Sequence, residues 1–374
     1  MKKNVGMEET SAKARQYSRI KTRLLIIQLL LTAVFLVIFL VSGGSVFLRN
    51  LVAGWSGNLY LQVGLYLVAF SGIYYLLFVG LDFYSGFLLE HKFSLSNQPL
   101  FGWLKKSIKK GVLSLLLLLA AGEVLYFLLR YFPNYWWLLT TAAWVLFVII
   151  LGKIVPVLII PLFYKCTPLA NDGLKEKLIG LCKKCGVGIE QVFEIYLSKE
   201  TKKANAAVAG MGKGRRILLS DTLLESFSED EVEAVLAHEL GHVRMLHIWK
   251  ILAFGTVVAL ISFFLSYLFF GRAMAALGFD DISDIAGFPL LAIVLMILGF
   301  AFMPIQNGYL RRLEKRADIF AAQHIASPNS FVSAMTKLAE QNLADPNPEK
   351  WEELLFYDHP PISKRLRYVA TENN

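Results

Sequence analysis

The sequence is poor in cysteine and in charged residues. Its 374 residues include three cysteines, too few for the disulfide framework that staples small secreted domains. Cys182 and Cys185 form a lone C-x-x-C without a partner pair, so we expect two helical thiols in a reducing compartment rather than a metal site. Charged residues make up 18% of the chain, whereas soluble domains carry about 25%. This low charge argues against an ordinary soluble protein.

Hydrophobic residues, by contrast, make up 56% of the chain and gather in long runs. Six runs are long enough to cross a bilayer, since about 20 apolar residues span its hydrocarbon core. The predicted spans are Leu24–Leu48, Tyr60–Leu81, Gly111–Leu129, Trp136–Tyr164, Ile251–Gly271 and Phe288–Leu310. The fold class is therefore an all-α polytopic membrane protein with about six transmembrane helices and a small α+β cytoplasmic region.

The net charge of +9 follows from where the lysines and arginines lie. The loops on one side of the six spans, residues 49–59, 132–135 and 272–287, hold two arginines and three aspartates. Most other basic residues fall on the opposite side. The positive-inside rule therefore predicts cytoplasmic N and C termini, in a bacterial inner or plasma membrane or a eukaryotic ER-type membrane. Membrane lipid is an expected partner and nucleic acid is not; the oligomeric state is left open.

The chain divides into five predicted segments. They are a partly disordered cytoplasmic arm (1–23), a four-span region (24–164), a cytoplasmic region (165–250), a two-span region (251–310) and a cytoplasmic helical tail (311–374). Within the central region, periodicity predicts a helix over Lys175–Cys185, followed by strands over Val192–Leu197, Asn205–Ala209 and Arg216–Ser220. Gly210 to Gly214 lack the spacing of a phosphate-binding loop and are predicted to form a hairpin connection.

The most informative stretch is His238-Glu239-Leu240-Gly241-His242. It lies in a predicted helix, Glu229–Met245, whose N-cap is expected within residues 226–229. Residues four apart lie about 40° apart around a helix, so both imidazoles face one point, and Glu239 can reach a water there. This is the pattern of a zinc-binding helix with its general base. The alternative is a surface helix with two solvated histidines.

Zinc in a catalytic site needs a third protein ligand. The sixth span returns to the side of the histidine helix and leads directly to Glu314 and Asp318, so we expect Glu314 to be the third ligand. Asp318, one turn on, can accept the outer N–H of a ligand histidine and fix its tautomer. His247, about 140° around the helix from His242, is expected to face away from the metal. The alternative for the two carboxylates is pairing with neighbouring lysine and arginine on a charged helix.

Three other histidines and one arginine are further candidates for a role in the site. His324 is expected to be structural, and His91 lies in a basic loop without ligand spacing. His359 precedes Pro360-Pro361, with Arg365 six residues further on. A proline pair suits a histidine that must be held in one direction, but an ordinary tail histidine fits the residues equally well.

Several segments together resemble the type I CAAX prenyl endopeptidases, integral membrane zinc metalloproteases. The resemblance runs from about Glu90 to Arg365. Its motifs are Glu90-His91-Lys92-Phe93, Pro161-Leu162-Phe163, Cys166-Thr167-Pro168-Leu169, Asn205-Ala206, Asp221-Thr222-Leu223-Leu224-Glu225, the histidine helix, Gly278-Phe279, Glu314 with Asp318, and His359-Pro360-Pro361 with Arg365. Six predicted spans, where eukaryotic members have seven, suggest a bacterial homologue.

The resemblance implies a site as well as a fold. It implies one zinc ion bound by His238, His242 and Glu314, with Glu239 as catalytic base. It further implies that Asn205 and Ala206 lie on a strand that pairs with the substrate backbone. His359 and Arg365 would line the site, and we expect one of the two, His359 or Arg365, to donate to the oxyanion.

The resulting hypothesis is a membrane-embedded zinc metalloendopeptidase. It would cleave membrane-associated or lipidated, CAAX-like peptides near the cytoplasmic face. One alternative is a general quality-control zinc protease of the membrane, and another is a non-catalytic scaffold or transporter.

Overall fold

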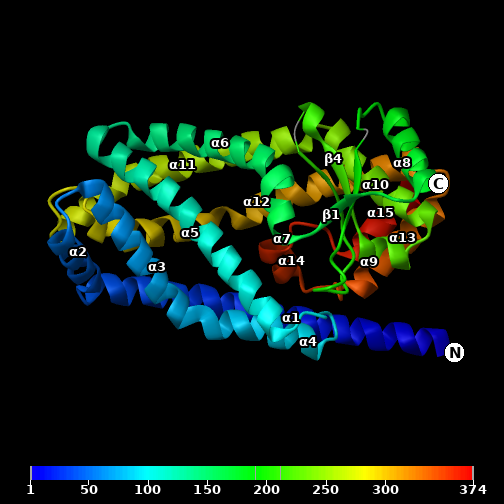
Figure 1. The fold of residues 1–374 in the computed structure, drawn as a ribbon, viewed down its shortest axis with the longest axis horizontal. Helices are drawn as coiled ribbons and strands as arrows, with labels where there is room; N and C mark the ends of the chain where they lie inside the picture. Colours follow the sequence, from blue (N-terminus) through cyan, green and yellow to red (C-terminus); the bar gives the residue numbers. More distant parts are fainter. Residues whose placement is uncertain (1, 190, 211, 373–374) are drawn as a thin grey trace.

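The structure is a computed structural model that describes residues 2–189, 191–210 and 212–372, and it is mainly helical (Figure 1). The helices of the apolar part are α1 (Lys2–Val41), α2 (Gly44–Trp55), α3 (Leu59–Phe83), α4 (Leu89–Lys92), α5 (Leu100–Tyr131), α6 (Trp136–Ile154), α7 (Ile160–Phe163), α11 (His247–Ala276) and α12 (Phe288–His324). The π-helical turns η1 (Tyr84–Leu88) and η2 (Val155–Ile159) join α3 to α4 and α6 to α7, and the 3-10 turn η4 (Ile285–Gly287) precedes α12.

The remaining elements form a polar part. Its strands are β1 (Cys166–Pro168), β2 (Val192–Ile195), β3 (Ala206–Ala209) and β4 (Arg216–Ser220), with the 3-10 turn η3 (Gly212–Gly214). Its helices are α8 (Asp172–Lys184), α9 (Asp221–Ser226), α10 (Glu229–Arg244), α13 (Pro328–Gln341), α14 (Lys350–Phe356) and α15 (Ile362–Glu372). Cys182 lies on α8 and Cys185 directly follows that helix, and both are buried free thiols.

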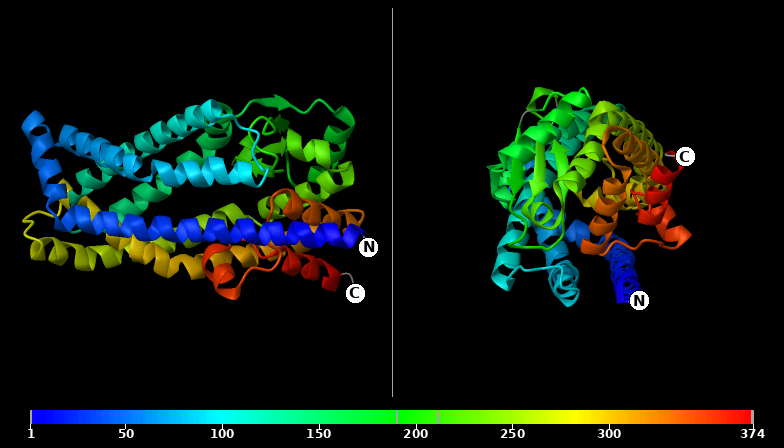
Figure 2. Two further views of the ribbon diagram at one scale, coloured as in Figure 1. Left: turned by 90° about the horizontal axis from the view of Figure 1, so that it is seen from below. Right: turned by 90° about the vertical axis from the view of Figure 1, so that its right-hand side faces the viewer.

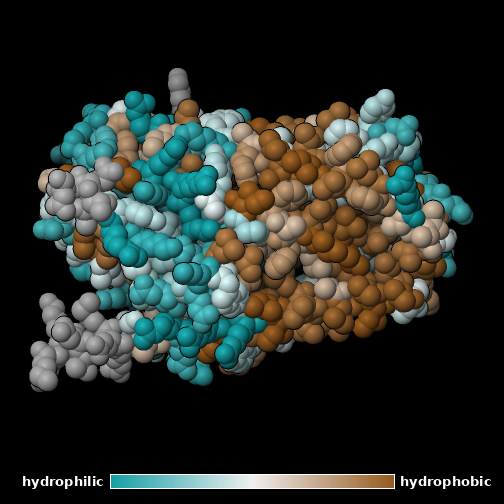
Figure 3. All heavy atoms as spheres, turned by 180° about the vertical axis from the view of Figure 1, so that it is seen from behind, coloured by the Kyte–Doolittle hydropathy of each residue, from teal (hydrophilic) through white to brown (hydrophobic). Residues whose placement is uncertain are grey.

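Six helical segments are long and apolar enough to cross a membrane, as the sequence predicted. They are Thr10–Val41, Leu59–Lys92, Leu100–Tyr131, Trp136–Phe163, His247–Ala276 and Ile285–His324. On the face drawn in Figure 3, apolar side chains form a broad band over the long helices, whereas polar side chains cover the part at one end and gather again at the opposite tip. The sheet, α8, α10, α13 and both chain ends lie at the polar end, and α2 lies at the opposite end (Figure 1).

The first segment differs from the prediction of a partly disordered arm over residues 1–23. Helix α1 is continuous over Lys2–Val41 and runs as one rod along the molecule (Figure 2). The reason is packing that the charge pattern hides. Tyr17 is buried against Phe93, and its hydroxyl donates to Glu90 at 2.5 Å. Lys21 also pairs with Glu90, at 3.0 Å. These contacts hold the basic stretch of α1 against α4.

The four strands form one sheet in the order β1-β2-β4-β3. Strands β2 and β4 are parallel, and β3 and β4 are antiparallel, so the predicted hairpin connection is confirmed. The sequence missed β1, which has only three residues. Strand β3 is at the edge of the sheet. The N–H of Ser220 donates to the carbonyl of Asn205 at 2.9 Å, so alternation directs the backbone groups of Ala206 and Val208 to the free edge.

Helix α10 lies at the centre of the polar part. A capping box starts it, in which Ser228 is the N-cap and Glu231 the return partner, within the range predicted. Glu231 also accepts hydrogen bonds from Ser333 at 2.6 Å and Lys337 at 2.7 Å, which tie this end to α13. Most residues from Val232 to Gly241 are buried in the core between the sheet, α12 and α13. The histidine helix is therefore a core helix, not a surface helix.

Candidate metal centre

The helical register brings the two histidines of α10 together. Their Nε2 atoms are 3.1 Å apart, and the rings stand at 76° to each other. His238 is buried and His242 is half-buried. The imidazoles therefore present their outer nitrogens to one point, as the four-residue spacing predicts.

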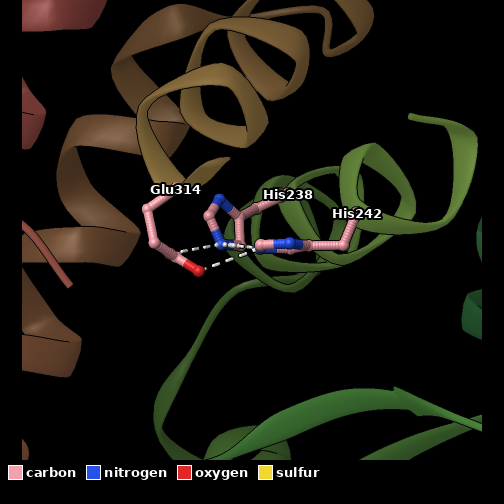
Figure 4. A group of neighbouring side chains, drawn as sticks. All are labelled: His238, His242 and Glu314. Carbon is pink, nitrogen blue, oxygen red and sulfur yellow. Dashed lines mark hydrogen bonds and ion pairs between the residues drawn. The ribbon is translucent and has the colours of Figure 1, made fainter. Parts of the chain in front are cut away.

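Helix α12 brings a carboxylate to the same point (Figure 4). Glu314 Oε2 lies 3.3 Å from His238 Nε2, and Glu314 Oε1 lies 3.2 Å from His242 Nε2. The close approach depends on Gly241, because a Cβ there would lie 3.2 Å from Ala317 Cα and 3.1 Å from the Phe320 ring. A side chain at position 241 would push the two helices apart. The structure thus brings together the three residues expected to be ligands.

The donor set fits a zinc ion. Two imidazole nitrogens and one carboxylate are among the ligand sets of catalytic zinc sites. Donors bound at about 2.0–2.1 Å to a tetrahedral ion lie about 3.3 Å apart, and the observed separations are 3.1, 3.2 and 3.3 Å. Glu314 Oε2 is also buried without a well-aligned hydrogen bond, which a metal bond would satisfy.

Asp318 supports the outer side of His238. Its buried carboxylate Oδ1 accepts from His238 Nδ1 at 2.9 Å, the contact expected from the sequence, and this leaves the Nε2 lone pair for a metal. Burial opposes charging of the His238 ring, but its close contacts with the Asp318 and Glu314 carboxylates outweigh it and raise its pKa to about 9. A divalent cation would replace that proton as the positive partner of the two carboxylates.

Arg365 of α15 neutralises Asp318. Its Nε lies 2.9 Å from Oδ2 and one terminal nitrogen lies 2.6 Å from Oδ1, the two-pronged geometry that guanidinium and carboxylate favour. The pKa of Arg365 is raised, because Asp318 outweighs the effect of burial. Arg365 therefore acts on the metal centre through Asp318, in addition to lining its cavity.

A cavity of about 320 Å³ opens beside the metal centre. Within the described residues, the Glu239 carboxylate forms no hydrogen bond or ion pair and is available to a water molecule. The predicted site residues that line this cavity are Asn205, Ala206, His238, Glu239, His359 and Arg365. Residues predicted from widely separated segments thus share one space with an edge strand on its wall.

His359 is another polar residue of the cavity wall, close to Glu314. Its Nε2 lies 3.4 Å from Glu314 Oε1, and its Nδ1 donates to the neighbouring Asp358 at 2.8 Å. This hydrogen bond raises the pKa of His359 and favours the protonated ring, against the effect of burial. The side chain remains 56% exposed, so it can reach a substrate in the cavity. The proline pair after it lines the same cavity.

His247 does not face away from the centre, contrary to the expectation from helical spacing. Its Nδ1 lies 3.0 Å from His242 Nδ1. The expectation assumed one continuous helix with about 100° of rotation per residue. Instead, α10 ends at Arg244, and Leu246 adopts a left-handed φ of 57° before α11 begins. His324 is structural, as expected, since its ring stacks on Phe320 and its Nδ1 bonds the Phe320 carbonyl.

Asn342 is a further residue that the sequence did not reveal. Its side-chain oxygen accepts from the Ala204 N–H at 3.0 Å, and its side-chain nitrogen donates to the Ala204 carbonyl at 3.1 Å. This double contact fixes the backbone immediately before Asn205 and β3. No local pattern marks Asn342, because it acts across 138 positions of the chain.

Two family models match the chain. The model described as peptidase family M48 matches residues 168–373, more than half of the chain. The model described as CAAX prenyl protease N-terminal, five membrane helices, matches residues 3–165. In that part the described residues form four candidate spans and the short helix α2.

The relatives extend over most of the chain. A Bacillus subtilis protein named uncharacterized metalloprotease YhfN is 28% identical and aligns over 97% of this chain and 86% of its own length. The CAAX prenyl protease 1 homolog of Arabidopsis thaliana is 30% identical over 78% of this chain and 69% of its own. The crystal structure of S. mikatae Ste24p superposes with a TM-score of 0.83 at 28% identity, over 96% of this chain and 88% of that one.

The sequence matches, the shared fold and the M48 model agree with the enzyme class predicted from the sequence. The chain belongs to peptidase family M48, as a membrane-embedded metalloendopeptidase of the CAAX prenyl protease 1 and Ste24 group.

Proposed function

We propose that the chain binds one zinc ion through His238, His242 and Glu314 and hydrolyses extended peptides laid along β3. The observation that carries this proposal is the donor spacing of 3.1 to 3.3 Å beside a cavity that His238 lines and an edge strand borders. A bound zinc ion supplies a Lewis acid that polarises a carbonyl and makes water acidic. The protein residues orient the peptide and move the protons.

Glu239 has the position of the general base. It would take a proton from the attacking water as the water oxygen bonds to the scissile carbonyl carbon, and pass that proton to the leaving amine as the C–N bond breaks. The His359 ring, protonated through Asp358, would donate toward the carbonyl oxygen as negative charge develops there. Arg365 adds positive charge on the same wall while it holds Asp318. Each group thus has one role in water addition and amine release.

Replacing Glu239 by glutamine tests the role of the base. The amide cannot accept the proton, so kcat should fall by about 10²–10⁴-fold, whereas zinc content should stay near one per chain because Glu239 is not among the proposed ligands. Peptide cleavage and metal analysis of the same purified sample measure both quantities. Glu229→Gln, an exposed position in the first turn of α10, is the matched control. Near-normal turnover of Glu239→Gln would show that another group is the base.

The edge strand gives a binding mode for the peptide. The backbone groups of Ala206 and Val208 point to the free edge, so a peptide strand can add there through main-chain hydrogen bonds. Such binding depends little on the side chains of the peptide. Asn205 and Ala206 line the cavity next to Glu239. The added strand would therefore pass the metal centre with its backbone aligned.

N-methylation of the substrate tests strand addition without changing the enzyme. Methyl groups placed one at a time on a cleaved peptide should lower kcat/KM by about fivefold or more at every second residue, because each removes one edge hydrogen bond. The intervening positions should change it less than twofold. Mass spectrometry of timed digests measures the rates. A scan with no period of two would contradict pairing with β3.

A membrane-associated or lipidated substrate agrees with the surroundings of the site. A second cavity of about 260 Å³ shares Asn205 and Ala206 with the first and is bounded by Ile160 and Tyr164 at the end of the fourth span. Its lining is mostly apolar. We propose that the chain prefers CAAX-like lipidated peptides, as the name of the Arabidopsis relative indicates for that protein.

Paired peptides of one sequence, farnesylated or unmodified, test this preference in detergent or nanodiscs. We expect kcat/KM for the farnesylated peptide to be higher by about tenfold or more, since each buried CH₂ is worth about 0.8 kcal/mol. A farnesylated peptide with a proline at the scissile position controls for trapping by the detergent. Equal rates would favour the broader membrane quality-control role.

We further propose that both termini and the metal centre face the cytoplasm, with the five segment boundaries given above. The loops at the far end are poor in lysine and arginine.

In a Cys166→Ser background, Gly57→Cys should react with a membrane-impermeant maleimide in intact cells. Glu176→Cys should react only after permeabilisation. Both positions are exposed in the structure. The reverse labelling pattern would invert the topology.

A further inference from the structure

The second metal-ligand histidine has a partner on its outer side that differs from that of the first. His242 turns Nε2 toward Glu314 and His238, and its other ring nitrogen, Nδ1, lies 3.0 Å from His247 Nδ1. The two rings stand at 77° with centroids 4.9 Å apart. His247 is 1% exposed, so this contact is shielded from water.

The backbone is arranged to produce this contact. Leu246 has φ 57° and ψ 36°, a left-handed backbone conformation that residues other than glycine rarely adopt. It ends α10 and starts α11 within two residues, and His247 becomes the first residue of α11. A continuous helix would have carried His247 to the opposite face. The reversal turns it back onto the ring of His242.

Hydrogen placement then follows from what a metal requires. A histidine that binds a metal through Nε2 carries its proton on Nδ1, and it needs an acceptor for that proton. His247 Nδ1 is the atom within reach. The other nitrogen of His247, Nε2, is buried and has no hydrogen-bond partner among the described residues. Nothing on that side competes to set the tautomer, so His247 can keep its proton on Nε2 and accept with Nδ1.

We infer that His247 is a positioning residue for the metal centre: it accepts the Nδ1 proton of His242 and fixes the tautomer and ring direction in which Nε2 faces the ion. This inference rests on the proposed zinc site. His247 contacts the Nδ1 of His242 as Asp318 contacts the Nδ1 of His238, but the His247 ring carries no negative charge. The pair of supports is therefore asymmetric, with a neutral ring on one ligand and a carboxylate on the other.

Two substitutions at position 247 separate the acceptor from the bulk of the ring. In His247→Asn the side-chain oxygen takes the place of Nδ1, so the acceptor is kept. In His247→Phe the ring is kept and the acceptor is lost. Zinc affinity, measured by competition with a chromogenic chelator on the full-length protein in detergent, should fall about 10–100-fold for His247→Phe, the usual cost of losing such a partner. For His247→Asn it should stay within about threefold of the unsubstituted protein.

A second measurement distinguishes positioning from a general structural role. The thermal unfolding temperature of the metal-depleted protein should change little in His247→Phe, since the loss of the Nδ1 contact with His242 is offset by the removal of Nε2, a buried polar atom without a partner among the described residues. The zinc-dependent rise in that temperature should shrink instead. A loss of stability in the metal-depleted state that matches the loss of zinc affinity would overturn the inference.

The controls keep the inference separate from the proposed function. Glu314→Gln should lose zinc almost completely. If the unsubstituted protein also binds none, the proposed function fails. If the unsubstituted protein binds one zinc and His247→Phe binds it equally tightly, only the role of His247 fails. Should His247→Phe not fold, His247→Gln replaces it, because its longer side chain places the oxygen near the Nε2 position. Zinc affinity equal to that of His247→Asn would then overturn the inference.

Discussion

The close approach of α10 and α12 is the constraint on which the site depends. Gly241 lies directly against the Ala317 backbone and the Phe320 side chain of α12, with little room for a Cβ of its own. Glu314 and Asp318 lie on the same face of α12, one turn apart, so they meet the two nitrogens of His238 from both sides. A larger residue at 241 would move both carboxylates together. Helix packing and ligand geometry are therefore one property of the fold.

The charges at this contact must balance, because most of them are buried. Asp318 is completely inaccessible, and an unpaired carboxylate there would be strongly unfavourable. Arg365 supplies the counter-charge from α15, close to the end of the chain. The same segment carries His359 and the proline pair to the cavity wall. The segment with His359 and Arg365 is thus part of the metal centre, and the ion pair between Arg365 and Asp318 holds it there.

Much of this arrangement could be read from the sequence. The six spans follow from apolar run lengths, and β4 was predicted with its exact bounds. The proximity of Glu314 to the histidines follows from two antiparallel helices that end at one membrane face. The partly disordered arm predicted for residues 1–23 is a helix instead, because charge composition does not show that Glu90 binds Tyr17 and Lys21. His247 was misplaced because a single left-handed Leu246 breaks the helical count. Asn342 acts on Ala204 from far along the chain. Such long-range or single-residue effects leave no periodic signal.

The open edge of β3 remains the most telling feature. Proteins usually cover or charge an edge strand, because its unpaired N–H and C=O groups invite association with other chains. Here β3 consists of three alanines and one valine, without a charge or proline to block it. The Asn342 and Ser220 side chains instead accept hydrogen bonds from the N–H groups of Ala204 and Asn205, directly before the strand. A strand that is left unpaired on one side and lies beside a metal-binding group agrees with the proposed role as a template for an extended peptide.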